Sequence, residues 1–308
     1  MSESTIFELV GKHYDEAAFQ MELDRLPIAA PVEMHITLRY LARYVPDAAR
    51  VCEIGVGGGI YSLALARRGC ALHFVDVSRR LLEYVEKKVR EAGFGSQIAG
   101  STYASATDLA AIDSAQFDAV LLLGPLYHLL TEVDRRSAVT ESRRLLKSGG
   151  VLFAAGINRI GALRELFRDF RSIPFVTPEM AAEWDIVRRR TIDAGCAPGS
   201  FLDGYLHDGN VDPEHAPPVG YAHLATVGEF RALFGAFNEI AMAGVESFTA
   251  PWQYRLNELP EAERELWLDL VETTSTTVEG LAYSDHFLYI GRADQTRNQQ
   301  TCIPARPS

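Results

Sequence analysis

The chain has 308 residues, 47% hydrophobic and 23% charged, and its 30 Lys+Arg against 41 Asp+Glu give a formal net charge of −11. This composition is typical of a soluble globular protein with one large domain or two small ones. The acidic balance disfavours a nucleic-acid or anionic-membrane partner, because the summed field of the protein would repel both.

Cysteine usage and the hydrophobic runs indicate where such a protein works. Four cysteines are spread along the chain without a C-x-x-C pair, and residues 1–9 are polar and acidic, unlike a signal peptide. The longest nearly uncharged stretch, residues 119–130, is far below the roughly 20 residues that a membrane-spanning helix needs. We therefore expect a cytoplasmic protein without a membrane span; the sequence carries no signal for an oligomeric state.

Helical and strand patterns alternate through the first half of the chain. Periodicity and breakers predict helices over 34–44, 60–67, 79–92 and 134–146, and strands over 50–55, 71–77, 96–104, 117–123 and 151–157. Residues 147–150, Lys-Ser-Gly-Gly, are expected to end a helix in a tight turn. Since parallel strands need helical crossovers, the order predicts a mostly parallel sheet with helices on both faces. Such sheets bind ligands at the carboxyl ends of their strands.

The alternation of helical and strand patterns stops after residue 158 and resumes at residue 226. Residues 159–225, here called the lid segment, carry helical pieces and a stretch rich in Gly, Pro, Asp and His, which we interpret as an inserted substrate-binding lid. Beyond it we predict a helix over 226–234, a strand over 240–246, a helix over 260–281 and a strand over 286–291. The sheet then has seven strands, contributed by residues 1–158 and 226–293, and residues 294–308 form a frayed tail.

A glycine-rich loop follows the first predicted strand. The segment Glu53 to Gly59 (EIGVGGG) leads into the helix over 60–67, so the backbone can approach a ligand closely where side chains are absent. Asp76 closes the next strand, at the distance expected for a partner of a ribose diol. The loop alone is compatible with a simple turn, but the strand, loop, helix and acid together indicate a nucleoside-containing cofactor.

Two classes of cofactor compete for this loop. A nicotinamide or flavin dinucleotide places its pyrophosphate at the helix N-terminus, and its glycine pattern needs Gly or Ala where this chain has Ile60. Glu53 would also bring a carboxylate near those phosphates. S-adenosylmethionine has no phosphate and carries an ammonium and a sulfonium, which a carboxylate favours. The residues thus favour the sulfonium cofactor, with an oxidoreductase as a weaker alternative.

Several segments of the sequence together resemble a known family. The glycine loop, Asp76 and the segments 117–129 (FDAVLLLGPLYHL) and 141–159 (ESRRLLKSGGVLFAAGINR) resemble class I S-adenosylmethionine-dependent methyltransferases of the bacterial small-molecule kind. The resemblance covers residues 31–159 well and residues 226–291 loosely. It implies a Rossmann-like fold, S-adenosyl-L-methionine as the cofactor and a small molecule as the methyl acceptor.

The resemblance also implies contacts with the cofactor, position by position. The methionine part would lie along Glu53, Gly55 and Gly57, with backbone of Leu123 and Gly124 at its amino-acid end. Ribose hydroxyls would donate to Asp76, and the adenine would lie against Val77 and against Ala106 with Thr107 or Asp108. Ser105 departs from the family, because many relatives carry an acidic residue there.

Tyr127 and His128 directly follow the fourth strand, where the transferred methyl group should point. Methyl transfer from a sulfonium needs in-line approach, a route for the acceptor's proton and exclusion of water. His128 can act as the general base, and Tyr127 can orient the substrate or meet the sulfonium with its ring face. A framework role for His128 is an equal alternative, because many methyl transfers require only proximity.

Other residues are candidates for contacts with the substrate. Asn158 and Arg159 end the fifth strand at the same mouth, and Arg159 can either bind a carboxylate or pair with a surface acid. The remaining candidates are Tyr205, His207, Tyr221 and His223 in the lid segment and Tyr14, Glu33 and Thr37 before the first strand, each with ordinary packing as an alternative. The acidic stretch 203–215 matches neither a calcium loop nor a zinc pattern, so no metal site is expected.

The sequence as a whole predicts methyl transfer to nitrogen, oxygen or carbon of a metabolite, in secondary metabolism. A second hypothesis keeps the same site, but the enzyme cyclises S-adenosylmethionine itself to azetidine-2-carboxylate and methylthioadenosine. A third is a protein that binds S-adenosylmethionine without catalysis. The cofactor motifs are common to all three.

Overall fold

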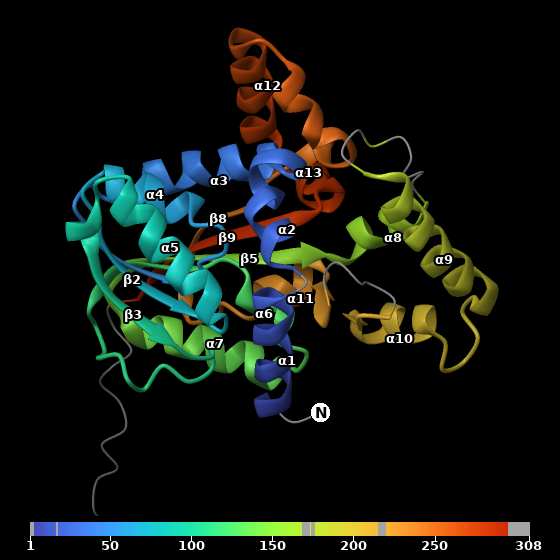
Figure 1. The fold of residues 1–308 in the computed structure, drawn as a ribbon, viewed down its shortest axis with the longest axis horizontal. Coiled ribbons are helices and arrows are strands. Elements are labelled where there is room, and N and C mark those ends of the chain that lie inside the picture. The colour runs from blue at the N-terminus through green and yellow to red at the C-terminus, as the bar shows by residue number, and fades with distance from the viewer. Residues whose placement is uncertain (1–2, 17, 168–172, 174–175, 215–219, 295–308) are drawn as a thin grey trace, which may run out of the picture.

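A computed structural model describes residues 3–16, 18–167, 173, 176–214 and 220–294 of the chain. Its centre is a twisted sheet with helices on both faces, and α8 to α10 extend to one side beyond the end of β5 (Figure 1). None of the helices in these ranges combines the length and the apolar character that crossing a membrane requires. The expected frayed tail lies, apart from Asp294, outside the described residues.

The sheet confirms the predicted fold class and exceeds the predicted number of strands. The strands are β1 (Arg50–Ile54), β2 (Ala71–Asp76), β3 (Ile98–Tyr103), β4 (Phe117–Leu122), β5 (Leu146–Asn158), β6 (Asn210–Val211), β7 (Ala222–Ala225), β8 (Phe237–Gly244) and β9 (His286–Ala293). β3, β2, β1, β4 and β5 lie side by side and parallel, whereas β9 is antiparallel to β5 and β8 is antiparallel to β9. The sheet of the described residues therefore has nine strands instead of seven.

The two additional strands come from the lid segment. β7 pairs in parallel with the last two residues of β5, at Ile157 and Asn158, and β6 pairs antiparallel with β7. With four and two residues, these strands are too short for an alternating pattern to be read. Residues 147–150, expected as a tight turn, are part of β5, which pairs with β4 across a register shift between Phe117 and Ala119.

The helices follow the predicted periodicity with one clear difference. They are α1 (Glu3–Asp15), α2 (Phe19–Asp24), α3 (Pro31–Tyr44), α4 (Ile60–Arg67), α5 (Arg79–Glu91), α6 (Pro125–His128), α7 (Glu132–Leu145), α8 (Arg159–Phe167), α9 (Pro178–Ala194), α10 (Phe201–Asp208), α11 (Val227–Ala232), α12 (Glu261–Thr274) and α13 (Val278–Tyr283). The single helix expected over 260–281 is two helices. The Thr277 hydroxyl accepts a hydrogen bond from the Gly280 N–H and so caps a new helix, α13.

Successive strand residues point into two separate cores. In β4, Leu121 packs into the core beneath α3, α4 and α5, and Leu122 packs into the core beneath α7 and α11. The same alternation holds for Val51 and Cys52 in β1. Helices cover both faces of the sheet. A ligand is therefore expected to bind at the edge where the parallel strands end.

Candidate functional site

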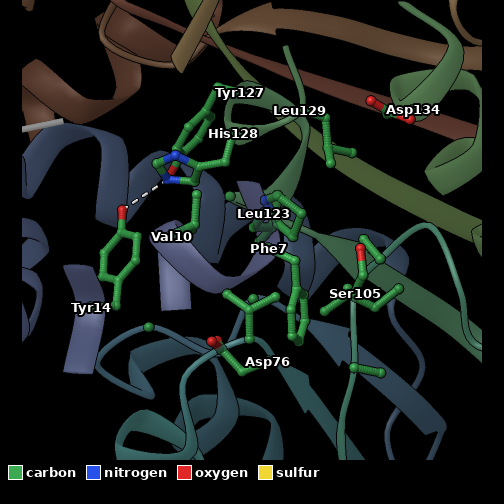
Figure 2. Close-up of a pocket in the computed structure, with 18 of the residues that line it drawn as sticks. Phe7, Val10, Tyr14, Asp76, Ser105, Leu123, Tyr127, His128, Leu129 and Asp134 are labelled. Carbon is green, nitrogen blue, oxygen red and sulfur yellow. Dashed lines mark hydrogen bonds between the residues drawn. The ribbon is translucent and has the colours of Figure 1, made fainter. Parts of the chain in front are cut away.

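A cavity of about 190 Å³ opens at the carboxyl ends of β1, β2 and β4. Strand ends and the loops after them line it on one side, and Phe7, Val10 and Tyr14 of α1 line it on another (Figure 2); Glu22 of α2 also lines it. Its walls include Phe7, Val10, Tyr14, Glu22, Gly55, Gly57, Asp76, Val77, Ser105, Ala106, Leu123, Tyr127, His128, Leu129 and Asp134. The parallel sheet thus brings the glycine loop, Asp76 and the segment after β4 to one place.

The glycine loop is shaped by close backbone approach. Gly55 has φ +84°, and a Cβ there would lie 2.7 Å from the Cδ of Pro125 in α6. Gly57 has φ +48°, and a Cβ there would lie 2.5 Å from the Oε1 of Glu22 in α2. A larger residue at either position would have a strained backbone at positive φ, and its Cβ would clash with the neighbouring helix. The two glycines therefore let α2 and α6 close around the loop.

Asp76 is held in one orientation at the wall of the cavity. Its Oδ2 accepts a hydrogen bond from the Val56 N–H and its Oδ1 one from the Ser78 N–H, both 2.8 Å. Burial raises the pKa of Asp76 to about 6. Each carboxylate oxygen has capacity for a further hydrogen bond, which is what a ribose diol requires.

Glu53 and Thr107 are placed differently from the other proposed cofactor contacts. Glu53 is 1% exposed, does not line the cavity and accepts a hydrogen bond from the Ser62 hydroxyl of α4. Burial raises its pKa to about 8, so it is mostly protonated at neutral pH in this state. Thr107 also lies outside the cavity walls, and its Oγ1 is 2.7 Å from the Oγ of Ser105, which lines them.

Tyr14 and His128 form a hydrogen-bonded pair inside the cavity. The Tyr14 hydroxyl lies 2.9 Å from the Nε2 of His128 (Figure 2). The Nδ1 of His128 lies 2.8 Å from the backbone oxygen of Tyr221. Because a carbonyl oxygen only accepts, Nδ1 carries the proton of the neutral ring and Nε2 accepts from Tyr14. Tyr221 therefore contacts this pair through its backbone oxygen.

Burial keeps both members of this pair uncharged. It lowers the pKa of His128 to about 4 and raises the pKa of Tyr14 well above its usual value. At neutral pH the imidazole is thus a neutral base, and its Nε2 lone pair already accepts the hydrogen bond from the Tyr14 hydroxyl. The ring of Tyr127 packs against His128 with centroids 4.7 Å apart and also lines the cavity.

Asn158 and Arg159 have other partners and do not line the cavity. The Asn158 amide donates to backbone oxygens around the end of α13, among them that of Ser284 at 2.8 Å. Arg159 is buried, pairs with Glu229 at 2.8 Å and donates to the Leu224 carbonyl. These contacts tie β5 to α13, β7 and α11, which is a framework role.

The remaining substrate candidates also lie outside the cavity walls. The Tyr205 hydroxyl donates to the Arg159 backbone oxygen inside the core. The Nδ1 of His223 pairs with the Asn210 side chain at 3.0 Å. Glu33 accepts from Arg25 at 2.8 Å, Thr37 is buried in α3, and the His207 side chain is 79% exposed. Of the substrate candidates, the structure places Tyr14 in the cavity.

The wall residues on the first two helices, apart from Tyr14, escaped sequence reasoning. Phe7 and Val10 lie on α1, and Glu22 lies on α2. One signal was available: a glycine, Gly11, lies inside α1, and a Cβ there would lie 2.5 Å from the backbone oxygen of Val77. The missing side chain lets α1 rest directly on the end of β2.

Known proteins resemble this chain over the region that holds the glycine loop and Asp76. A family model described as a methyltransferase domain matches residues 52–154. A ubiquinone biosynthesis O-methyltransferase of Xylella fastidiosa (strain 9a5c) is 32% identical over 170 residues, which are 51% of this chain and 65% of that protein. One of Xanthomonas axonopodis pv. citri (strain 306) is 33% identical over 128 residues, covering 41% and 51%. The chain thus spans half to two thirds of the length of these relatives.

Solved structures share the fold across nearly the whole chain. The CcbJ methyltransferase of Streptomyces caelestis has a TM-score of 0.54 at 15% identity, covering 96% of this chain and all of that one. Magnesium protoporphyrin IX methyltransferase of Synechocystis PCC 6803, solved with bound SAH, has a TM-score of 0.54 at 13% identity, covering 94% and 100%. Residues 52–154, with the glycine loop and Asp76, thus match a methyltransferase domain, and the whole chain has the fold of S-adenosylmethionine-dependent methyltransferases.

Proposed function

We propose that this chain transfers a methyl group from S-adenosylmethionine to nitrogen, oxygen or carbon of a small molecule. One observation carries the proposal: the glycine loop, Asp76 and the Tyr14–His128 pair line a single cavity at the carboxyl ends of β1, β2 and β4. The names of the relatives, O-methyltransferases of ubiquinone biosynthesis, support a small organic acceptor.

The cavity walls suit the parts of this cofactor. Gly55 and Gly57 leave backbone open to the methionine part, with Leu123 nearby, and the two oriented oxygens of Asp76 can accept from the ribose hydroxyls. Val77 and Ala106 offer apolar surface to the adenine. Glu22 adds a carboxylate to this wall, which favours the positive charges of the cofactor.

Tyr14 and His128 provide a route for the acceptor's proton. The bound cofactor supplies an electrophilic methyl group. The acceptor's proton can pass to the Tyr14 oxygen while the Tyr14 proton passes to the Nε2 of His128, and the cofactor would leave as uncharged adenosylhomocysteine. The pair ends as neutral tyrosine and imidazolium, whose Nδ1–H stays on the Tyr221 carbonyl. His128 is buried and Tyr14 is half-buried, which limits the access of water to this transfer.

The test incubates the protein with S-adenosylmethionine, first alone and then with a panel of phenols, amines and carboxylic acids. Mass spectrometry follows adenosylhomocysteine, methylthioadenosine and methylated products. Acceptor-dependent adenosylhomocysteine supports the proposal. Methylthioadenosine formed without an acceptor would show the cyclisation reaction instead, and cofactor binding without turnover by any acceptor would show a binding protein.

A further inference from the structure

A second cavity, of about 390 Å³, lies on the far side of α6 from the glycine loop. It is enclosed by α6, the start of α7, the end of β5, β7 and α11. Apolar side chains, chiefly Leu126, Phe230 and Leu233, make much of its wall. Tyr127 is shared with the cofactor cavity, so one aromatic ring borders both spaces.

The cavity contains a buried arginine that forms no ion pair with the described part of the chain. Arg135, on α7, is 9% exposed, and its guanidinium donates to the Leu129 backbone oxygen at 2.6 Å. Across the described ranges of the chain, no carboxylate comes within ion-pairing distance of it, 4.0 Å. Since a guanidinium has five N–H donors, most of them are left for something else. None of these N–H groups is among the buried unpaired atoms of the described residues, so they are accessible from the cavity.

The neighbouring carboxylates are engaged elsewhere. Glu132 pairs with Arg136 at 2.7 Å, and Glu229 pairs with Arg159 at 2.8 Å. The Oδ1 of Asp208 accepts from the Asn210 N–H at 2.8 Å. These acids border the cavity but do not neutralise Arg135.

The electrostatics of the cavity agree with an uncompensated charge. Burial lowers the pKa of Arg135, although the charges of Glu132, Glu229 and Asp134 act in the opposite direction. Burial and the nearby charge of Arg135 lower the pKa of His223 to about 4, so this wall histidine is neutral. Arg135 therefore offers a positive charge that an anionic ligand can bind.

We propose that this cavity is a second ligand site, which binds a small organic carboxylate through Arg135. The planar fork of a guanidinium matches a carboxylate, and Leu126, Phe230 and Leu233 suit an apolar body attached to it. The surrounding acids select a singly charged group over a phosphate, because they repel a second negative charge. This site goes beyond the methyl transfer proposed above and needs no cofactor.

The test is calorimetric titration of the protein with benzoate, and with benzamide as an uncharged ligand of the same shape. Benzoate is expected to bind at least tenfold more tightly than benzamide. Arg135→Gln should weaken benzoate binding at least tenfold. The matched control is Arg143→Gln, the same change two turns later on α7 and away from the cavity walls, which should leave the affinity unchanged.

A second variant covers the case in which Arg135→Gln does not fold. Ala232 lines the cavity from an exposed position, so Ala232→Trp can fill the space while Arg135 remains. It too should weaken benzoate binding at least tenfold. Equal affinity for benzoate and benzamide, undiminished binding in both cavity variants, or no benzoate binding at millimolar concentration would overturn the site. All titrations omit S-adenosylmethionine, so a failure of the methyl-transfer proposal would not affect them.

Discussion

At the scale of single residues, the same side-chain type has different roles according to its partners. His128 and His223 are both buried with pKa values lowered to about 4. His128 receives a hydroxyl proton donor at Nε2 inside the cofactor cavity, whereas the Nδ1 of His223 is bonded to Asn210. Only His128 is therefore positioned to accept a proton from a group in that cavity.

Removing either member of the Tyr14–His128 pair should slow turnover with little effect on cofactor affinity. We expect Tyr14→Phe and His128→Ala to lower kcat by about 10²-fold or more, the range of general-base catalysis. Binding of adenosylhomocysteine, measured by calorimetry, should change less than threefold. The double variant should be no slower than the slower single variant, because the two residues act as a unit. Near-unchanged turnover in both single variants would assign the pair a framework role.

At the scale of elements, α1 acts as a cover whose position depends on one missing side chain. Gly11 lets α1 lie against the backbone of Val77, and this places Phe7, Val10 and Tyr14 on the cavity. The Tyr14 contact with His128 joins residues 114 positions apart in sequence. The pair thus exists only while α1 is docked.

Gly11→Ala should therefore weaken cofactor binding without unfolding the domain. The added Cβ would lie 2.5 Å from the Val77 oxygen, which is backbone and cannot yield as a flexible side chain would. Overpacking of this kind costs about 1–3 kcal/mol, which corresponds to roughly a 5- to 150-fold loss of affinity. Calorimetry with adenosylhomocysteine measures it. Gly228→Ala on α11 is the control, since its Cβ meets nothing within 4 Å; equal affinities would contradict the docking role of α1.

At the scale of the whole molecule, a cluster of charged side chains ties α3 and β9 to the segment that follows β8. The Nδ1 of His286 lies 2.6 Å from the Oε1 of Glu246 and 3.5 Å from the Oε2 of Glu33, which also binds Arg25. Burial opposes the charge on His286, but Glu33 and Glu246 outweigh it and raise its pKa to about 9. The pKa of Glu246 is correspondingly lowered.

This cluster should make stability fall in mildly alkaline solution. The folded pKa of His286 exceeds the unfolded value of about 6.5, so its contribution is complete below pH 6.5 and is lost as pH rises to about 9. Between pH 7 and 9, the free energy of unfolding of the wild type should fall about 2 kcal/mol more than that of His286→Gln. Urea unfolding at several pH values measures these slopes. The control His207→Gln, at an exposed site, should keep the wild-type slope; parallel slopes for His286→Gln and wild type would refute the cluster's role.

The sequence determined what lies within short segments of the chain. The strand, glycine loop, helix, strand and Asp76 run consecutively from residue 50 to residue 76, and their apolar periods and φ requirements are local. Once the strands are parallel, their carboxyl ends must meet, so Gly55, Asp76 and Tyr127 come together by topology. The fold class and the floor of the cofactor cavity followed from these local signals.

Only the tertiary structure decided which polar groups are available to a ligand. Arg159 directly follows β5 and begins α8, and Glu229, 70 residues later, pairs with it, whereas Arg135 on α7 has no such partner within the described residues. Tyr14 meets His128 because α1 docks on Val77, and β7 exists because it pairs with the last residues of β5. Partners distant in sequence leave no local pattern, because their contact is fixed by packing of the whole domain and not by the propensity of either segment.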